Sequence, residues 1–324
     1  MTDTTGADAA TVRVGAIDCG TNSIRLLVAD VEPRAAGLTD VLRRMEIVRL
    51  GHGVDRTGAI EPAAMERTLT RCREYAAQCR ELGAERVRFV ATSASRDASN
   101  AADFVAGVRE AFAEYDVAPE VVTGEEEASL SFRGATGDLR AHGIPGPYLV
   151  VDLGGGSTEF VRGLDDVEVA RSVDIGCVRM TERHLESDPP TDAEIAAAVR
   201  DIDAAIDRAA EAVDLNGIAS LVGLAGSVTT ITANALRLTE YDAERIHLTT
   251  LTPAQVLASC QELLHLTRAQ RAALGFMHPG RVDVIGAGAL VWHQVVQRLS
   301  GLGVESVVTS EHDILDGIAL SLLD

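Results

Sequence analysis

Ile17-Asp18-Cys19-Gly20-Thr21-Asn22-Ser23 is the stretch that decides the fold, because its pattern returns at Val151-Asp152-Leu153-Gly154-Gly155-Gly156-Ser157. Each copy runs from an apolar residue through Asp, one further residue, Gly and two small residues to Ser. Apolar strand patterns flank both copies, at 12–17 and 24–31 and at 148–151 and 158–161. A polar, glycine-containing turn between two strands predicts a hairpin. The repeat therefore indicates two structurally related halves.

Between these hairpins the sequence alternates strand and helix patterns, which predicts an α/β fold. We expect helices near 62–82, 101–112, 125–139 and 192–213, and a strand at 87–91. A Gly/Pro-rich joint at Gly143 to Pro147 is typical of a boundary, and 324 residues at about 150 per domain suggest two domains. We place them at residues 1–140 and 141–310.

Composition excludes several classes of protein. A net charge of −20 argues against DNA binding, which needs a basic surface. Every positively charged side chain is Arg and none is Lys, for which codon bias is the favoured explanation. Met1 to Thr11 has no leader character and no stretch reaches the roughly 18 apolar residues of a membrane span, so we expect a cytoplasmic protein. Five scattered cysteines without a Cys-x-x-Cys pair predict reduced, packed thiols.

Asp18 and Asp152 each end a strand beside a glycine-rich turn. This arrangement places a carboxylate that can hold a hydrated cation next to backbone N–H groups that can bind phosphate oxygens. The structural alternative is a tight turn with a capping Asp, but the repeat favours a phosphate clamp. The turn does not fit a Rossmann site, since Glu159 stands where the third glycine belongs.

Three carboxylates crowd a helix start at Thr123 to Ala128. Thr123 and Glu126 fit a capping box and Glu125 suits the helix dipole, which leaves Glu127 without a structural role. Phosphoanhydride hydrolysis needs a group that orients water, a divalent cation and positive donors. Glu127 is our candidate for the first of these needs.

The divalent cation and the positive donors also have candidate residues. Asp152 and Glu159 could hold the cation, and Arg96 could contact phosphate because it follows the strand at 87–91. The alternative for Arg96 is a surface ion pair with Asp97. The turn at Gly223 to Ser227, which opens a helix, is a weaker anion site. For His312-Asp313 we favour a helix start capped by Ser310 over a metal site.

These segments together resemble the exopolyphosphatase and guanosine pentaphosphate phosphatase family, in order and spacing over nearly the whole chain. The segments that carry the resemblance are Ala16 to Ser23, Ala91 to Ala98, Thr123 to Ala128, Val151 to Glu159 and Gly223 to Thr229. The resemblance implies two ribonuclease-H-like domains of the actin and sugar-kinase superfamily, with the site in the cleft between them. It also implies that the C-terminal helix, 311–324, returns to the first domain.

The resemblance assigns roles to individual residues. It implies Glu127 as the catalytic residue and Asp152 and Glu159 as ligands of Mg²⁺ or Mn²⁺. Asp18 joins these ligands because it ends the matching strand of the first half. Phosphate would be bound by Asn22, Ser23, Arg96, Gly154, Gly155, Gly156, Ser157, Gly226 and Ser227. The chain resembles the short members, which lack an added helical region, and a homodimer is expected.

Four candidate functions are compatible with these residues. The first is an exopolyphosphatase acting on inorganic polyphosphate, and the second is a hydrolase that removes the 5′-terminal phosphate of guanosine pentaphosphate (pppGpp). The third is a phosphotransferring kinase, which needs a nucleotide pocket, and the fourth is a silent polyphosphate or alarmone sensor. The complete acid set, Glu127, Asp152 and Glu159, favours the hydrolases.

Overall fold

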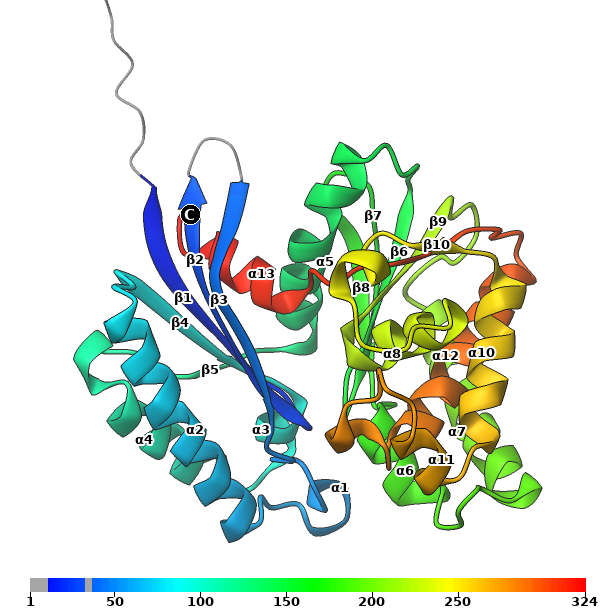
Figure 1. Ribbon diagram of the computed structural model, residues 1–324, viewed down its shortest axis with the longest axis horizontal. Helices are drawn as coiled ribbons and strands as arrows, with labels where there is room; N and C mark the ends of the chain where they lie inside the picture. The colour runs from blue at the N-terminus through cyan, green and yellow to red at the C-terminus, as the bar shows by residue number, and fades with distance from the viewer. Residues whose placement is uncertain (1–10, 33–36) are drawn as a thin grey trace, which may run out of the picture.

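The computed structural model describes residues 11–32 and 37–324, which form two β-sheets with helices packed against them (Figure 1). The polar N-terminal segment, residues 1–10, lies outside the described residues. Within the described part of the chain, no helix is both long and apolar enough to span a bilayer. All five cysteines are buried and free, as expected.

The first sheet has the strand order β3-β2-β1-β4-β5. Its strands are β1 (Val12–Cys19), β2 (Ser23–Glu32), β3 (Gly37–Ile47), β4 (Arg86–Ala91) and β5 (Glu120–Val121). The first three strands form an antiparallel meander, and β4 and β5 run parallel to β1. The hairpin predicted around residues 18–23 is therefore the β1–β2 hairpin.

The second sheet repeats this arrangement, with the order β10-β11-β9-β6-β7-β8. Its strands are β6 (Tyr148–Leu153), β7 (Thr158–Gly163), β8 (Val167–Val173), β9 (Ser220–Leu224), β10 (Thr250–Leu251) and β11 (Val307–Thr309). Again a three-stranded antiparallel meander is extended by parallel strands, here β9 and β11. The two related halves inferred from the sequence repeat are confirmed.

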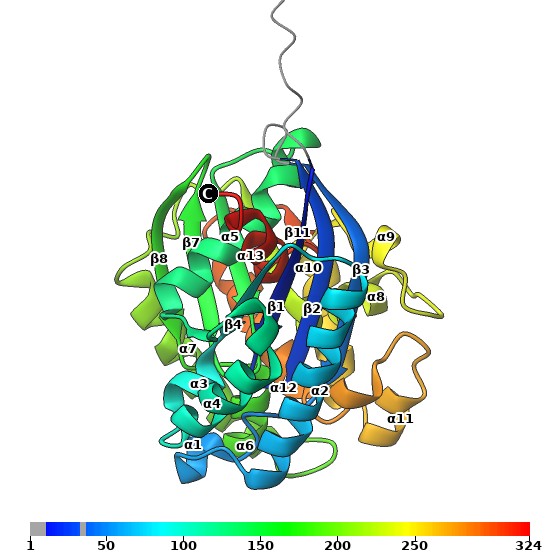
Figure 2. The same ribbon diagram turned by 90° about the vertical axis from the view of Figure 1, so that its left-hand side faces the viewer.

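Helices cover the outer faces of both sheets. The helices of the chain are α1 (Val54–Thr57), α2 (Pro62–Glu81), α3 (Ser93–Asp97), α4 (Ala101–Ala111), α5 (Gly124–Ala141), α6 (Cys177–His184), α7 (Asp192–Ala210), α8 (Ala225–Ala235), α9 (Ala243–Ile246), α10 (Pro253–His265), α11 (Arg268–Ala272), α12 (Ile285–Ser300) and α13 (Ile314–Ser321). Figure 2 shows α2 and α4 in front of the first sheet, where they bury Ile17 and Cys19 of β1. Burial of this apolar face is the main stabilisation of the layer.

Helices α5 and α13 lie between the two sheets (Figure 1). The apolar side chains of α13 pack on Val14 and Ala16, which point to the inner face of β1, whereas α5 packs on the second sheet. The two helices cross closely because Gly134 and Gly317 have no side chains: a Cβ at Gly134 would overlap the Asp313 carbonyl, and one at Gly317 the Leu130 carbonyl. This crossing places the start of α13 beside Gly134, in the middle of α5.

Two expected helix starts differ from the structure. Helix α13 is capped by Asp313, whose Oδ1 accepts from Leu315 N at 3.0 Å, so Ser310 is not its cap. Ser310 Oγ instead accepts from His312 N in the preceding turn. At α5, Thr123 Oγ1 accepts from Glu126 N, but the Glu126 carboxylate pairs with Arg88 at 2.8 Å instead of completing the capping box.

Candidate active site

The two acidic turns close with the same hydrogen bond. Gly20 N donates to Ser23 O at 2.9 Å in the first turn, and Gly154 N donates to Ser157 O at 3.1 Å in the second. Within the described residues, the N–H groups of Asn22, Gly155 and Gly156 have no intramolecular acceptor. Each turn therefore presents free backbone donors, the arrangement that binds phosphate oxygens.

The tips of the two turns touch each other. A Cβ at Gly155 would lie 2.9 Å from Thr21 Cβ, and one at Gly156 only 2.8 Å from Thr21 Oγ1. Only glycine permits this approach of one hairpin to the other. The two turns are thereby fixed as opposite walls of one cleft.

This cleft holds a cavity of about 100 Å³ that both halves line. Of the residues named from the sequence, those that line it are Asp18, Asn22, Ser23, Glu127, Asp152, Gly154, Gly155, Gly156, Ser157, Gly226 and Ser227. Arg96 and Glu159 do not line it. Arg96 donates to the Glu127 carboxylate, and Glu159 lies opposite Asp152 in the β6–β7 register. All thirteen residues are therefore in or directly behind one site.

Four buried carboxylates belong to the site: Asp18, Glu127, Asp152 and Glu159. Burial raises the pKa of Asp152 to about 7, and the charge of Asp313 adds to the effect, while a hydrogen bond from Ser131 Oγ at 2.6 Å opposes it. Burial, with repulsion from Glu127 and Asp152, also raises the pKa of Glu159 well above its usual range. Burial without a matching positive charge disfavours the ionised forms, so this cluster is suited to a bound cation.

Asp18 has a different environment, because an arginine faces it across the hairpin. Arg25 donates to Asp18 Oδ2 from Nε at 2.9 Å and from an Nη at 2.7 Å, and its other Nη pairs with Asp313. Burial still raises the pKa of Asp18, with Arg25 opposing. Burial alone would raise the pKa of Asp313, but Arg25 outweighs this effect, so the pKa of Asp313 is lowered. Asp18 Oδ1 is buried and has no hydrogen-bond partner in the described structure.

Glu127 lies in the first turn of α5 and is held by Arg96. The Arg96 guanidinium donates to Glu127 Oε2 at 2.6 Å and to the Val122 carbonyl at 3.0 Å. Burial raises the pKa of Glu127 and Arg96 opposes the shift. Asp97 pairs instead with Arg179, so the surface pair of Arg96 with Asp97 is wrong. Glu127 is thus a buried, oriented carboxylate, as a general base must be.

The third small-residue turn, where α8 begins, also reaches the cavity. Ala225 has a left-handed φ of 68°, and Arg281 lies so close over Gly226 that a Cβ there would overlap its guanidinium. Arg281 also donates to Thr230 Oγ1 at 3.3 Å. Arg281 therefore adds a positive group to the lining of the cavity beside this turn.

Sequence reasoning missed four residues here: Arg25, Ser131, Arg281 and Asp313. Arg25 had a usable signal, because a turn of three residues between β1 and β2 places it directly opposite Asp18. Ser131 lies one turn of helix after Glu127, on the same face of α5. Arg281 and Asp313 come from distant segments, and their spacing offered no indication.

Comparison with known proteins agrees with this geometry. Residues 27–324 match the Ppx/GppA phosphatase family. The chain is 52% identical to Exopolyphosphatase 2 of Mycobacterium tuberculosis, over 97% of this chain and 99% of that protein. It is 28% identical to a guanosine-5′-triphosphate,3′-diphosphate pyrophosphatase of Aeromonas salmonicida, over 95% of this chain and 59% of that protein.

Solved structures show the same fold. A crystal structure of an exopolyphosphatase-like protein superposes with a TM-score of 0.92 at 44% identity, covering 96% of this chain and 98% of that one. The Aquifex aeolicus PPX-GPPA enzyme superposes with a TM-score of 0.78 at 28% identity, covering 96% and 100%. The repeated sheets are the two α/β domains of the actin and sugar-kinase fold class. The chain therefore belongs to the Ppx/GppA phosphatase family and is a hydrolase of phosphoanhydride bonds.

Proposed function

We propose that the protein is an exopolyphosphatase that releases orthophosphate from the end of an inorganic polyphosphate chain. The observation that carries the proposal is the pairing of free turn N–H groups with buried carboxylates around one cavity. The full-length similarity to Exopolyphosphatase 2 supports this choice of substrate.

The carboxylates suit a divalent cation, Mg²⁺ or Mn²⁺. Asp152, Glu159 and Asp18 would hold it, since their oxygens are hard ligands and Asp18 Oδ1 is buried without a partner. Such a cation offsets the negative charge that phosphate oxygens bring into the site. After burial itself, repulsion between carboxylates raises the pKa of both Asp152 and Glu159, and the cation would relieve that repulsion.

The positions of the side chains support a role for each group in the proposed reaction. The N–H groups of Asn22, Gly155 and Gly156 bind the terminal phosphate, with Ser23, Ser157, Gly226 and Ser227 around it. Glu127 takes a proton from water while the water oxygen bonds to the terminal phosphorus. The bridging P–O bond breaks, and its electron pair stays on the shortened chain as a phosphate oxygen. Arg96 keeps the Glu127 carboxylate oriented.

A second cavity, of about 460 Å³, provides room for the rest of the chain. It shares Arg25, Gly226 and Arg281 with the small cavity, so the two are adjacent, and Arg43 and Arg44 also line it. Arginine binds phosphate oxygens in pairs, which suits a repeating polyanion.

The alternative substrate is pppGpp, which the similarity to the Aeromonas salmonicida protein favours. The deciding experiment measures phosphate release from short polyphosphate, long polyphosphate and pppGpp under the same Mg²⁺ concentration. We expect polyphosphate to exceed pppGpp in kcat/KM by about tenfold or more, a difference of about 1.4 kcal/mol. Faster release from pppGpp overturns the assignment. Transfer of phosphate from ATP to an acceptor would indicate a kinase, and binding without turnover a sensor.

We also propose that the protein works as a cytoplasmic homodimer that binds no DNA. The net charge of −20 opposes contact with nucleic acid. Light scattering of the full chain tests whether it is a dimer. A DNA titration at low salt tests whether it binds DNA.

A further inference from the structure

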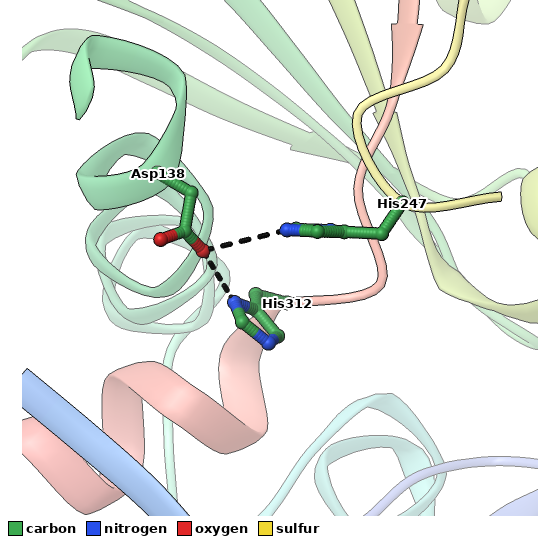
Figure 3. Close-up of side chains that lie close together, drawn as sticks. All are labelled: Asp138, His247 and His312. Carbon is green, nitrogen blue, oxygen red and sulfur yellow. Dashed lines mark hydrogen bonds and ion pairs between the residues drawn. The ribbon is translucent and has the colours of Figure 1, made fainter. Parts of the chain in front are cut away.

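A second cluster of ligand-type side chains lies outside the catalytic cleft. Among the described residues, Asp138, His247 and His312 form a group whose ligand atoms all lie within 4.8 Å of one another (Figure 3). Asp138 is in the last turn of α5, His247 follows α9, and His312 lies between β11 and α13. The three residues come from distant segments of the sequence, so their spacing gives no sign of a shared site.

The geometry converges on one oxygen. His312 Nδ1 lies 2.5 Å from Asp138 Oδ2, and His247 Nε2 lies 3.6 Å from the same atom. The ring centroids of the two histidines are 4.6 Å apart. Figure 3 shows both rings turned toward the Asp138 carboxylate. The His184–Asp201 pair at 3.1 Å is a useful contrast, since it joins only one imidazole to its carboxylate.

We propose that Asp138, His247 and His312 bind a transition-metal cation of the Zn²⁺ type, at a site separate from the catalytic carboxylates. Two imidazoles and one carboxylate are a ligand set for Zn²⁺, whereas Mg²⁺ prefers oxygen ligands only. All three side chains are partly exposed, at 35%, 23% and 37%, so water can complete a tetrahedral site. The ligand set thus separates this cation from the one proposed for the cleft.

Binding requires one local change. His247 Nδ1 now accepts from the Glu311 N–H at 3.2 Å, which leaves the proton of a neutral ring on Nε2. Coordination through Nε2 moves that proton to Nδ1, so the Glu311 N–H must turn to water. Glu311 is only partly buried, so water can reach this turn.

This turn is connected to the catalytic site. Two residues after Glu311, Asp313 pairs with Arg25, and Arg25 holds Asp18. A cation that draws the Glu311–His312 segment toward Asp138 therefore acts on the arginine that positions Asp18. We expect the cation to change the rate of phosphate release, and direct binding to remain the primary readout.

The test is equilibrium dialysis of the chelator-treated full chain against Zn²⁺, with excess Mg²⁺ present to occupy oxygen-ligand sites. The variants are His247→Gln and His312→Gln, and His184→Gln is the matched control. We expect one Zn²⁺ per chain in the wild type and the control, and affinity at least tenfold weaker in both site variants. Co²⁺ should give the visible absorption of a four-coordinate site in the wild type and in the His184→Gln control, and both site variants should lose it.

Three outcomes overturn the proposal: a wild type that binds no Zn²⁺, site variants that bind as tightly as the wild type, or loss of binding in only one of them. Asp138→Asn provides a further variant with nearly unchanged side-chain volume, and it should weaken binding as the histidine variants do. Thermal melts of each variant without metal check that the fold is intact. Failure here leaves the proposed polyphosphate hydrolysis untouched, because that reaction uses none of these three side chains.

Discussion

The two acidic turns share a sequence pattern and a hydrogen bond, yet their carboxylates meet different charges. Asp18 is matched by the Arg25 guanidinium, whereas Asp152 receives only a hydroxyl hydrogen bond from Ser131. Glu159, beside Asp152, likewise receives a hydroxyl bond, from Ser172 at 2.7 Å. The backbone repeat has thus been kept while the electrostatics diverged. Asp152 and Glu159 are thus the carboxylates of the site without a paired arginine, and the charge of Glu127 adds to the effect of burial at Glu159.

The largest effect is expected at Glu127, the carboxylate that we place between the two turns as the base. Glu127→Gln keeps the shape of the side chain but cannot take a proton, so kcat for polyphosphate should fall by about 10³-fold. Polyphosphate binding should change little. Initial-rate phosphate release and a binding titration measure the two quantities.

Glu126→Gln is the matched control for this variant. Glu126 is the preceding residue in the same helical turn but points to Arg88 at the surface, so its loss should leave kcat within about twofold. Unchanged turnover in Glu127→Gln would remove Glu127 from the mechanism.

The next effect tests the asymmetry of the turns directly. Asp152→Asn should reduce phosphate release by about 100-fold at a fixed Mg²⁺ concentration. It removes a proposed Mg²⁺ ligand from the turn whose carboxylate has no arginine partner. Asp18→Asn should cost only about tenfold, since Arg25 keeps its pair with Asp313. Rates measured across a Mg²⁺ titration give both values. An equal or larger loss of activity in Asp18→Asn would show that the two turns do not differ in the way proposed.

The sequence revealed much of this site because its signals are local. The repeat of Asp18 to Ser23 at Asp152 to Ser157 predicted both hairpins and the relatedness of the halves, and the helix start at Thr123 left Glu127 without a structural role. Strand β8 and helix α10 were missed although β8 alternates and α10 begins with a capping box and Pro253.

What the sequence could not provide depends on contacts between distant segments. Arg281 reaches the cleft through the folding of the second half, and Asp313 reaches Arg25 through the return of α13. No spacing in the sequence encodes those distances. The crossing of α5 and α13 at Gly134 and Gly317 is of the same kind, since each glycine is explained only by the partner helix.

The contact between the turns can be weakened at Gly156. A Cβ there would lie 2.5 Å from Ser93 Oγ and 2.8 Å from Thr21 Oγ1, so Gly156→Ala should lower the free energy of unfolding by about 1–3 kcal/mol. It should also separate the walls of the cleft. Gly137→Ala is the control, because nothing lies within 4 Å of its Cβ position in α5, and it should stabilise by about 0.5–1 kcal/mol. Urea unfolding of the two variants compares them, and equal stabilities would show that the turns do not press on each other.

The last effect is a pH dependence of stability that arises at Asp152 in the second turn. Burial raises the pKa of Asp152 to about 7 in the folded protein, above that of an ordinary carboxyl group. Its contribution to stability is therefore complete at low pH, below the ordinary carboxyl range, and is lost as the pH rises through about 7. Without metal, the free energy of unfolding should fall by up to about 1.4 kcal/mol per pH unit in that window from this one proton. Urea unfolding of metal-free protein between about pH 5 and pH 7 should show a shallower slope in Asp152→Asn than in the wild type. Added Mg²⁺ should flatten the wild-type slope as well, because it favours the ionised carboxylate. An identical slope in variant and wild type would mean that Asp152 is ionised throughout, and the second turn would then not be short of positive charge.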